Sequence, residues 1–284
     1  MEGVFVIWFP LTTGSKPVMG TNGLMCGRDG PVARVTMNRP KLHNAFDEDL
    51  IAGLTAAFLD LADDASVRVV VLTGAGRSFS AGADLNWMRR AAGYDAERNR
   101  ADARALEAML RALDELPKPT VAMVNGLAIG GGVGLVAACD VAVASASAAF
   151  ATSEVRFGIL PAVISPFVVR AIGGRQARRY FLTAERFGAE EARRVGLVHE
   201  VAEPDALEAR VGEIVAELLK GGPEALGEAK RLVRLVESMP QGGSLLAEAT
   251  VGMIAERRAS AEGREGIAAF LEKRPAGWLA PEAG

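Results

Sequence analysis

The sequence predicts an α/β protein. Two short runs of β-branched and apolar residues, 67–73 and 120–124, are bounded by Pro, Gly and Asn, a pattern typical of strands buried on both faces. Segments with a helical period alternate with such runs up to about residue 204, and from about Asp205 onward helical patterns dominate. This alternation alone does not distinguish a doubly wound sheet from other α/β architectures.

The other elements are predicted in chain order. Residues 32–37 alternate apolar and polar side chains, as in a strand, and a helix over 47–62 starts at Asp47, whose carboxylate can accept backbone N–H groups. A helix over 96–116 has a charged face and ends at Pro117, which cannot continue it. The remaining predicted elements are a helix from about 133, a strand over 140–144, and helices over 211–219, 223–236, 245–257 and 263–271.

Two glycine-rich turns, each directly after a predicted buried strand, are the most informative feature of the chain. One is Phe-Ser-Ala-Gly-Ala-Asp-Leu at 79–85, and the other is Asn-Gly-Leu-Ala-Ile-Gly-Gly-Gly at 125–132. Small residues let a ligand approach the backbone, and the unpaired first-turn N–H groups of a following helix attract negative charge. Two such turns can aim two N–H groups at one oxygen, as in an oxyanion hole, whereas a lone turn of this kind is better explained as an ordinary tight turn.

These turns belong to a series of motifs that resembles the enoyl-CoA hydratase/isomerase (crotonase) family. The others are Asn38-Arg39-Pro40 with Asn44-Ala45, Cys139-Asp140, and the segment 270–275, and the resemblance runs from about Gly30 to Pro275. It implies a crotonase-like repeated β-β-α spiral core over 25–204. It also implies a C-terminal helical oligomerisation region over 205–284 that builds a homotrimer or homohexamer.

The resemblance further implies a hydratase that adds water across the double bond of an α,β-unsaturated CoA thioester. Backbone N–H groups of Ala83 and Gly131 would hold the thioester oxygen, and Glu154 would act as acid and base. The second glutamate of the family's hydratases falls on Gly134. Either one glutamate serves both steps through an ordered water, or another side chain substitutes, or the enzyme is an isomerase. We also consider that Gly134 leaves room for a branched or carboxylated acyl chain.

Coenzyme A is expected as part of the substrate, with no separate cofactor. The resemblance places its adenine near Ala81, Asp84 and Leu85. The turn that carries Arg39 and Lys41 would lie near the pantetheine and phosphates. The other expected substrate contacts are Trp87, Gly130, Ala162 and, reaching the nucleotide phosphates from a neighbouring subunit, Lys273.

Two segments, 84–90 and 161–169, look like those of bacterial methylglutaconyl-CoA hydratases of leucine breakdown and the related isohexenylglutaconyl-CoA hydratases. Such substrates carry an extra carboxylate, for which Arg89, Arg90 and Arg156 are candidate partners. We therefore expect 3-methylglutaconyl-CoA or a similar branched glutaconyl-CoA as substrate. The alternatives are an enoyl-CoA double-bond isomerase and a CoA-thioester binding protein without turnover.

Composition excludes several other classes. The 284 residues are 50% hydrophobic with a net charge of −3, so the chain can bury a large core and offers no basic field for nucleic acid. Two cysteines and two histidines lack metal-ligand spacing, and neither an ATP-binding loop nor a third glycine for NAD is present. The apolar segment 4–11 is too short to span a membrane and lacks a basic flank. We expect a cytoplasmic protein with a poorly ordered N-terminal extension over 1–24.

Overall fold

The computed structural model describes residues 23–240 and 243–279, so the predicted extension lies almost entirely outside the described residues. The larger of its two sheets has six strands. Their spatial order is β1-β2-β3-β5-β7-β10, and all neighbours are parallel except the first pair. The strands are β1 (Leu24–Asp29), β2 (Val32–Met37), β3 (Val69–Gly74), β5 (Thr120–Val124), β7 (Val141–Ser145) and β10 (Glu200–Ala202).

A second, four-stranded sheet has the order β4-β6-β8-β9. These strands are short: β4 (Ser78–Ser80), β6 (Leu127–Ile129), β8 (Ala149–Ala151) and β9 (Phe187–Gly188). Each of three successive strand pairs, β3–β4, β5–β6 and β7–β8, gives its first strand to the large sheet and its second to the small one. A helix follows each pair. This repeat is the predicted β-β-α spiral, and it excludes the doubly wound alternative.

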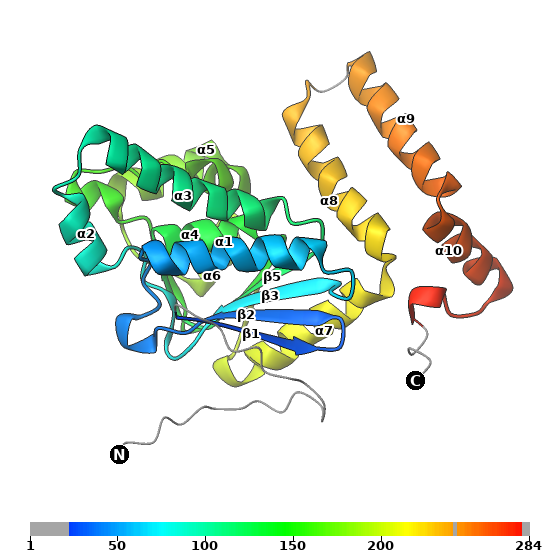
Figure 1. The fold of residues 1–284 in the computed structure, drawn as a ribbon, viewed down its shortest axis with the longest axis horizontal. Helices are drawn as coiled ribbons and strands as arrows, with labels where there is room; N and C mark the ends of the chain where they lie inside the picture. Colours follow the sequence, from blue (N-terminus) through cyan, green and yellow to red (C-terminus); the bar gives the residue numbers. More distant parts are fainter. Residues whose placement is uncertain (1–22, 241–242, 280–284) are drawn as a thin grey trace.

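Helices cover both faces of the large sheet (Figure 1). One side carries α1 (Glu48–Asp63), α3 (Ala96–Asp114) and α4 (Gly131–Ala138), and the other carries α7 (Leu207–Lys220). Because side chains alternate along a strand, Val70 and Leu72 of β3 pack with the first group while Val69 and Val71 pack with α7. The predicted cap is confirmed, since the Asp47 carboxylate accepts the Leu50 N–H at 2.9 Å.

Several elements were not predicted individually. They include the short strands of the second sheet and three helices around it. The helices are α2 (Leu85–Ala91), α5 (Ser165–Thr183) and α6 (Ala189–Val195), with 3₁₀ turns η1 (Pro40–Leu42), η2 (Glu154–Phe157) and η3 (Pro204–Ala206). The helix expected from about 133 begins two residues earlier, so Gly131 and Gly132 lie in its first turn.

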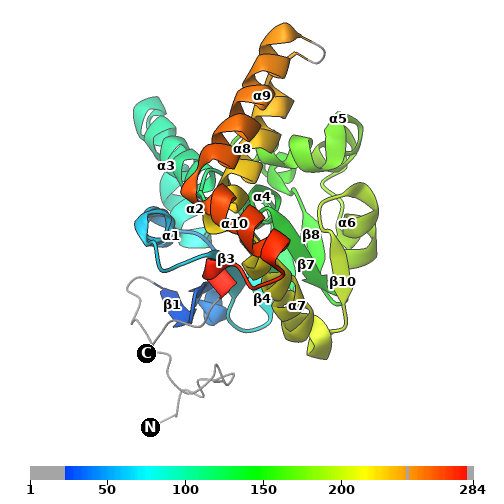
Figure 2. The same ribbon diagram turned by 90° about the vertical axis from the view of Figure 1, so that its right-hand side faces the viewer.

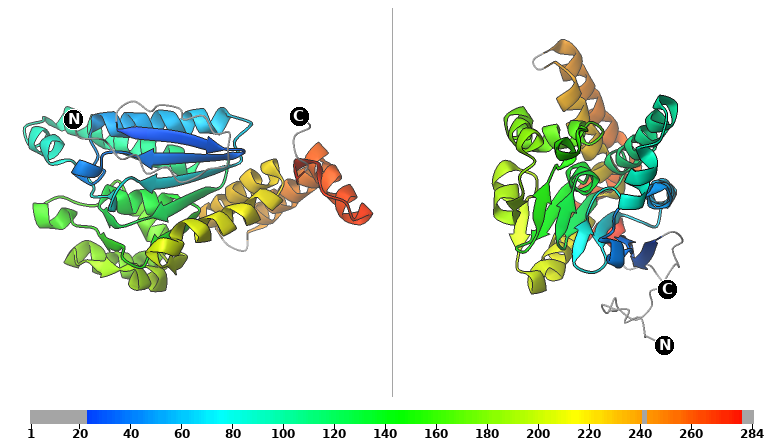
Figure 3. Two further views of the ribbon diagram at one scale, coloured as in Figure 1. Left: turned by 90° about the horizontal axis from the view of Figure 1, so that it is seen from below. Right: turned by 90° about the vertical axis from the view of Figure 1, so that its left-hand side faces the viewer.

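The C-terminal helices extend away from the sheets, as Figures 1 and 2 and the left view of Figure 3 show. They are α8 (Pro223–Ser238), α9 (Ser244–Ala259) and α10 (Ala261–Glu272), followed by the turn η4 (Gly277–Leu279). Lys230 of α8 anchors them to the core through an ion pair with Asp140, 2.8 Å long. Arg68 adds hydrogen bonds to the carbonyls of Leu219, Gly221 and Trp278. Among the described residues, no helix has the length and apolar character needed to cross a bilayer.

Candidate active site

The loop after β4 carries Ala83, an exposed residue that lies between two backbone hydrogen bonds. On one side of it the Gly82 carbonyl accepts the Phe46 N–H at 2.7 Å, and on the other the Asp84 N–H donates to the Phe46 carbonyl at 2.7 Å. These two bonds hold the loop like a short parallel bridge. Within residues 23–240 and 243–279, no protein acceptor takes the N–H of Ala83 itself. The loop therefore fixes a donor and leaves it free.

A second free donor lies at the start of α4. Gly130 precedes the helix with a φ of 51°, a left-handed conformation suited to glycine, and donates its own N–H to the Ala151 carbonyl at 2.9 Å. Gly131 is the first residue of the helix, so its N–H has no intrahelical partner. No acceptor for it occurs in the part of the chain that the structure describes. The positive end of the α4 dipole strengthens the attraction of this N–H for a negatively charged oxygen.

The two loops touch each other through their glycines. A Cβ added to Gly82 would lie 2.9 Å from the Ile129 carbonyl oxygen, and one added to Gly132 would lie 2.6 Å from the Ser80 carbonyl oxygen. No side chain fits at either position without a shift of the backbone. The free N–H groups of Ala83 and Gly131 thus belong to neighbouring turns in direct contact.

Glu154, the first residue of η2, completes the cluster. A Cβ added to Gly130 would lie 3.1 Å from Oε1 of Glu154, which places the carboxyl group next to the start of α4. Its other oxygen, Oε2, is buried without a hydrogen-bond partner in the described chain. Burial raises the pKa of the Glu154 carboxyl above its ordinary value. A partly desolvated carboxyl beside two free N–H donors is suited to moving protons near an oxyanion.

The space beside Gly134 is filled, and this corrects one expectation. A Cβ added here would lie 2.5 Å from Cγ2 of Ile164 and 3.5 Å from Cδ1 of Leu110. Gly134 therefore does not leave room for an acyl chain, because the Ile164 side chain occupies that volume. No local pattern indicates this packing, since Ile164 lies 30 residues away in the segment before α5.

Arg39 has internal partners. Its guanidinium pairs with Asp47 at 2.7 Å and with Asp84 at 3.5 Å, and it donates to the Ala45 carbonyl at 2.6 Å. These contacts connect the η1 turn to the start of α1 and to the loop that carries Ala83. The contact of Arg39 with coenzyme A stays a prediction, and the observed role is to hold this loop.

The other predicted contact residues are spread around these loops. Asp84 is buried and caps α2, because its carboxylate accepts the N–H groups of Asn86 and Trp87 at 2.8 and 3.2 Å. Ala81 is half-buried and Gly130 is buried, whereas the remaining positions are exposed: Lys41, Leu85, Ala162 and Lys273.

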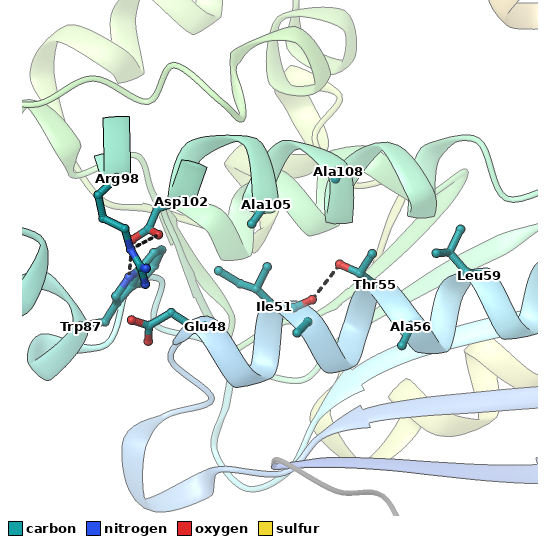
Figure 4. A pocket seen from close by; sticks show the side chains of 11 residues that line it. Glu48, Ile51, Thr55, Ala56, Leu59, Trp87, Arg98, Asp102, Ala105 and Ala108 are labelled. Atoms are coloured by element: carbon teal, nitrogen blue, oxygen red, sulfur yellow. Dashed lines mark hydrogen bonds and ion pairs between the residues drawn. The ribbon is translucent and has the colours of Figure 1, made fainter. Parts of the chain in front are cut away.

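Trp87 lies at one end of a groove of about 500 Å³ between α1 and α3 (Figure 4). Its indole N–H donates to Asp102 at 3.0 Å, and the rest of the groove is mostly apolar. The lining residues include none of Ala83, Gly131 and Glu154. The structure therefore places the Trp87 side chain, which α2 carries, at the end of this groove.

The three candidate arginines differ in their partners. Arg90 pairs with Glu48 at 2.5 Å, and Arg89 donates to the Asn86 amide oxygen at 2.7 Å. Arg156 lies in η2, two residues after Glu154, and is exposed. Its side chain has no hydrogen bond or ion pair with any described residue, so its charge is available to a ligand. No cluster of metal-ligating side chains occurs in the described ranges.

The raised pKa of Glu154 predicts a pH-dependent stability. Over the pH range between the unfolded value, about 4.3, and the raised folded value, the folded protein keeps a proton that the unfolded chain has released. Stability therefore falls as pH rises through this range and stays reduced above it. Glu154→Gln removes the cost of ionising a buried carboxyl. We therefore expect the variant to be more stable than the wild type near pH 8, with the difference in stability vanishing below about pH 4.

Urea denaturation at a series of pH values measures this difference. Glu97→Gln, at an exposed glutamate in the first turn of α3, is the matched control. A Glu154→Gln variant less stable than the wild type at pH 8 would mean that the ionised carboxylate is stabilised in the fold, contrary to its desolvated environment.

Comparisons with known proteins agree with this geometry. The model of the family described as enoyl-CoA hydratase/isomerase matches residues 27–281. A short-chain-enoyl-CoA hydratase of Clostridium acetobutylicum is 32% identical over 262 residues, covering 90% of this chain and 97% of the relative. The crystal structure of an enoyl-CoA hydratase from Shewanella pealeana superposes with a TM-score of 0.87 at 40% identity, covering 90% of this chain and 96% of that one. The structure of Pseudomonas aeruginosa AtuE superposes with a TM-score of 0.87 at 41% identity, and the match covers 91% of this chain and 100% of the AtuE chain. The chain belongs to the enoyl-CoA hydratase/isomerase family.

Proposed function

We propose that the chain is an acyl-CoA hydratase that adds water across the double bond of an α,β-unsaturated CoA thioester. The observation that carries the proposal is the pair of free N–H groups on touching turns, Ala83 and Gly131, with the Glu154 carboxyl packed against the intervening Gly130. Relatives named as hydratases, including a crotonyl-CoA hydratase of Syntrophomonas wolfei that is 31% identical over 265 residues, support the reaction type.

The proposed reaction uses each group for one task. The thioester oxygen accepts hydrogen bonds from Ala83 and Gly131, which stabilise the negative charge that this oxygen gains when water attacks the β-carbon. Glu154, in its ionised form, takes a proton from the attacking water, whose oxygen bonds to the β-carbon. The same carboxyl then returns a proton to the α-carbon, so that one water is added in total. Two preorganised donors supply about 3 kcal/mol each, judged from oxyanion-hole variants in other enzymes.

The absence of the second glutamate of the family's hydratases at position 134 also supports a second candidate, double-bond isomerisation. The three atoms nearest to a Cβ built on Gly130 all belong to Glu154, and the position of the second family glutamate, Gly134, faces Ile164. An isomerase needs only one carboxylate to take a proton from the α-carbon and return it to the γ-carbon. Binding of a CoA thioester without turnover is the third alternative.

We propose 3-methylglutaconyl-CoA, or a similar branched glutaconyl-CoA, as the substrate. The support is Arg156, which lies two residues after Glu154 in η2 and whose exposed side chain has no partner among the described residues. Such substrates carry a second carboxylate that a guanidinium can bind in a bidentate manner. Arg90 is neutralised by Glu48, so it is the weaker candidate.

We also propose that the chain assembles into a homotrimer or homohexamer through its C-terminal helices. Among the described residues, α8 and α9 have no fully buried side chain. Large apolar side chains on α9 and α10 are exposed in the single chain, and they include Leu245, Val251, Ile254, Phe270 and Leu271. A second copy would remove these surfaces from water.

Purified protein given 3-methylglutaconyl-CoA or crotonyl-CoA tests the reaction. We expect loss of the conjugated thioester absorbance, a product mass increased by one water, and faster turnover of the glutaconyl thioester. Glu154→Gln should lower kcat at least about 100-fold, because general acid-base catalysis contributes about that much. A β,γ-unsaturated thioester that only changes its double-bond position, with no mass increase for any substrate, would establish the isomerase instead. Binding without any turnover would establish the third alternative.

Arg156→Met tests the substrate class. If Arg156 binds the distal carboxylate, we expect the KM for 3-methylglutaconyl-CoA to rise about tenfold, the loss of one charge-assisted contact, with crotonyl-CoA unaffected. Arg104→Met, at an exposed arginine of α3 that has no proposed role in the site, is the matched control. Equal effects of Arg156→Met on both substrates would contradict recognition of the second carboxylate.

A further inference from the structure

We propose that Phe46 is a positioning residue that sets the separation between the two N–H donors of the oxyanion hole. The inference rests on the proposed role of Ala83 and Gly131. Phe46 is 1% exposed, so it does not contact solvent and is not placed to react with a substrate. Its position lets one residue contact both donor loops.

The main chain of Phe46 fixes the first donor. Its N–H and its carbonyl form the two 2.7 Å hydrogen bonds that lie on either side of Ala83, one to the Gly82 carbonyl and one from the Asp84 N–H. The direction of the Ala83 N–H is therefore set by the residues on both sides of it. A change of side chain at position 46 leaves these bonds available.

The ring of Phe46 fixes the second donor. A Cβ added to Gly131 would lie 2.5 Å from Cε2 and 2.9 Å from Cδ2 of this ring, so the ring packs directly on the first residue of α4. The ring thus acts as a spacer between the backbone bridge at Ala83 and the free N–H of Gly131. The contact also requires glycine at position 131.

Phe46 itself is held on both sides. Before it, Asn44 is fully buried and donates its side-chain amide to the carbonyls of Ser78 at 2.7 Å and Ala75 at 3.0 Å. After it, Asp47 pairs with Arg39 and caps α1. Because the residues before and after Phe46 are both fixed, its ring and backbone hold the two donor loops in one arrangement. A preorganised oxyanion site requires such a fixed arrangement.

Phe46→Leu tests the proposal, because it removes the ring and keeps the backbone bonds. We expect kcat to fall about 10- to 100-fold, since a displacement of about 1 Å has an effect of that size, with KM changed by less than about threefold. Phe58→Leu, at a fully buried phenylalanine of α1, is the matched control for lost packing and should leave kcat nearly unchanged. Phe46→Met restores much of the volume of the lost ring, so it should recover part of the activity. It replaces Phe46→Leu in the measurement of kcat if the leucine variant is unstable.

Binding provides a readout that a loss of stability does not change. Acetoacetyl-CoA, whose enolate carries negative charge on the thioester oxygen, is compared with saturated butyryl-CoA. We expect Phe46→Leu to weaken the binding of acetoacetyl-CoA at least about tenfold and that of butyryl-CoA less than about threefold, since the charged enolate oxygen depends more strongly on donor alignment than a neutral thioester carbonyl does.

Equal weakening of both ligands, or a kcat loss no larger than that of Phe58→Leu, would overturn the positioning role. If the wild-type protein binds acetoacetyl-CoA no more tightly than butyryl-CoA, Ala83 and Gly131 do not form an oxyanion hole, and the role proposed for Phe46 fails with it. The wild-type measurement therefore separates the two failures.

Discussion

The close approach of two backbone turns is the constraint on which the site depends. Gly82 lies against the Ile129 carbonyl and Gly132 against the Ser80 carbonyl, at distances that exclude any Cβ without a backbone shift. The three strand pairs of the spiral bring the turns to this contact, since β4 and β6 are neighbours in the second sheet. Two N–H groups without acceptors among the described residues result. Their orientation is fixed before a substrate binds, which is the condition under which such donors lower an activation barrier.

The same packing gives Glu154 its chemistry. Its carboxyl lies against Gly130, and one of its oxygens is buried with no hydrogen-bond partner in the described part of the chain. Burial raises its pKa toward the range in which a carboxyl can both accept and return a proton. An unsatisfied buried oxygen costs stability in the free protein. Sites of this kind combine a stability cost with function, and the cost is relieved when a water or substrate supplies the missing hydrogen bond.

Much of the fold and of the site could be predicted from the sequence, because the signals were local. The apolar runs of β3 and β5, the Asp47 cap, and the glycine turns follow from propensity and spacing over a few residues, and the family motifs supplied the spiral. The rest depends on contacts between distant segments. Ile164 filling the space beside Gly134, Arg39 pairing with Asp47 and Asp84, and Phe46 bridging both loops leave no periodic pattern. The short strands of the second sheet have too few residues to show a period.

A crystal structure of the protein with bound acetoacetyl-CoA would show directly whether the two N–H groups hold a thioester oxygen. We expect this oxygen to lie about 2.7–3.1 Å from the backbone nitrogens of both Ala83 and Gly131, the separation expected of oxyanion donors. We also expect the Glu154 carboxyl to face the reacting carbons. A thioester oxygen that binds another group, or that contacts only one of the two nitrogens, would mean that these N–H groups do not form an oxyanion hole.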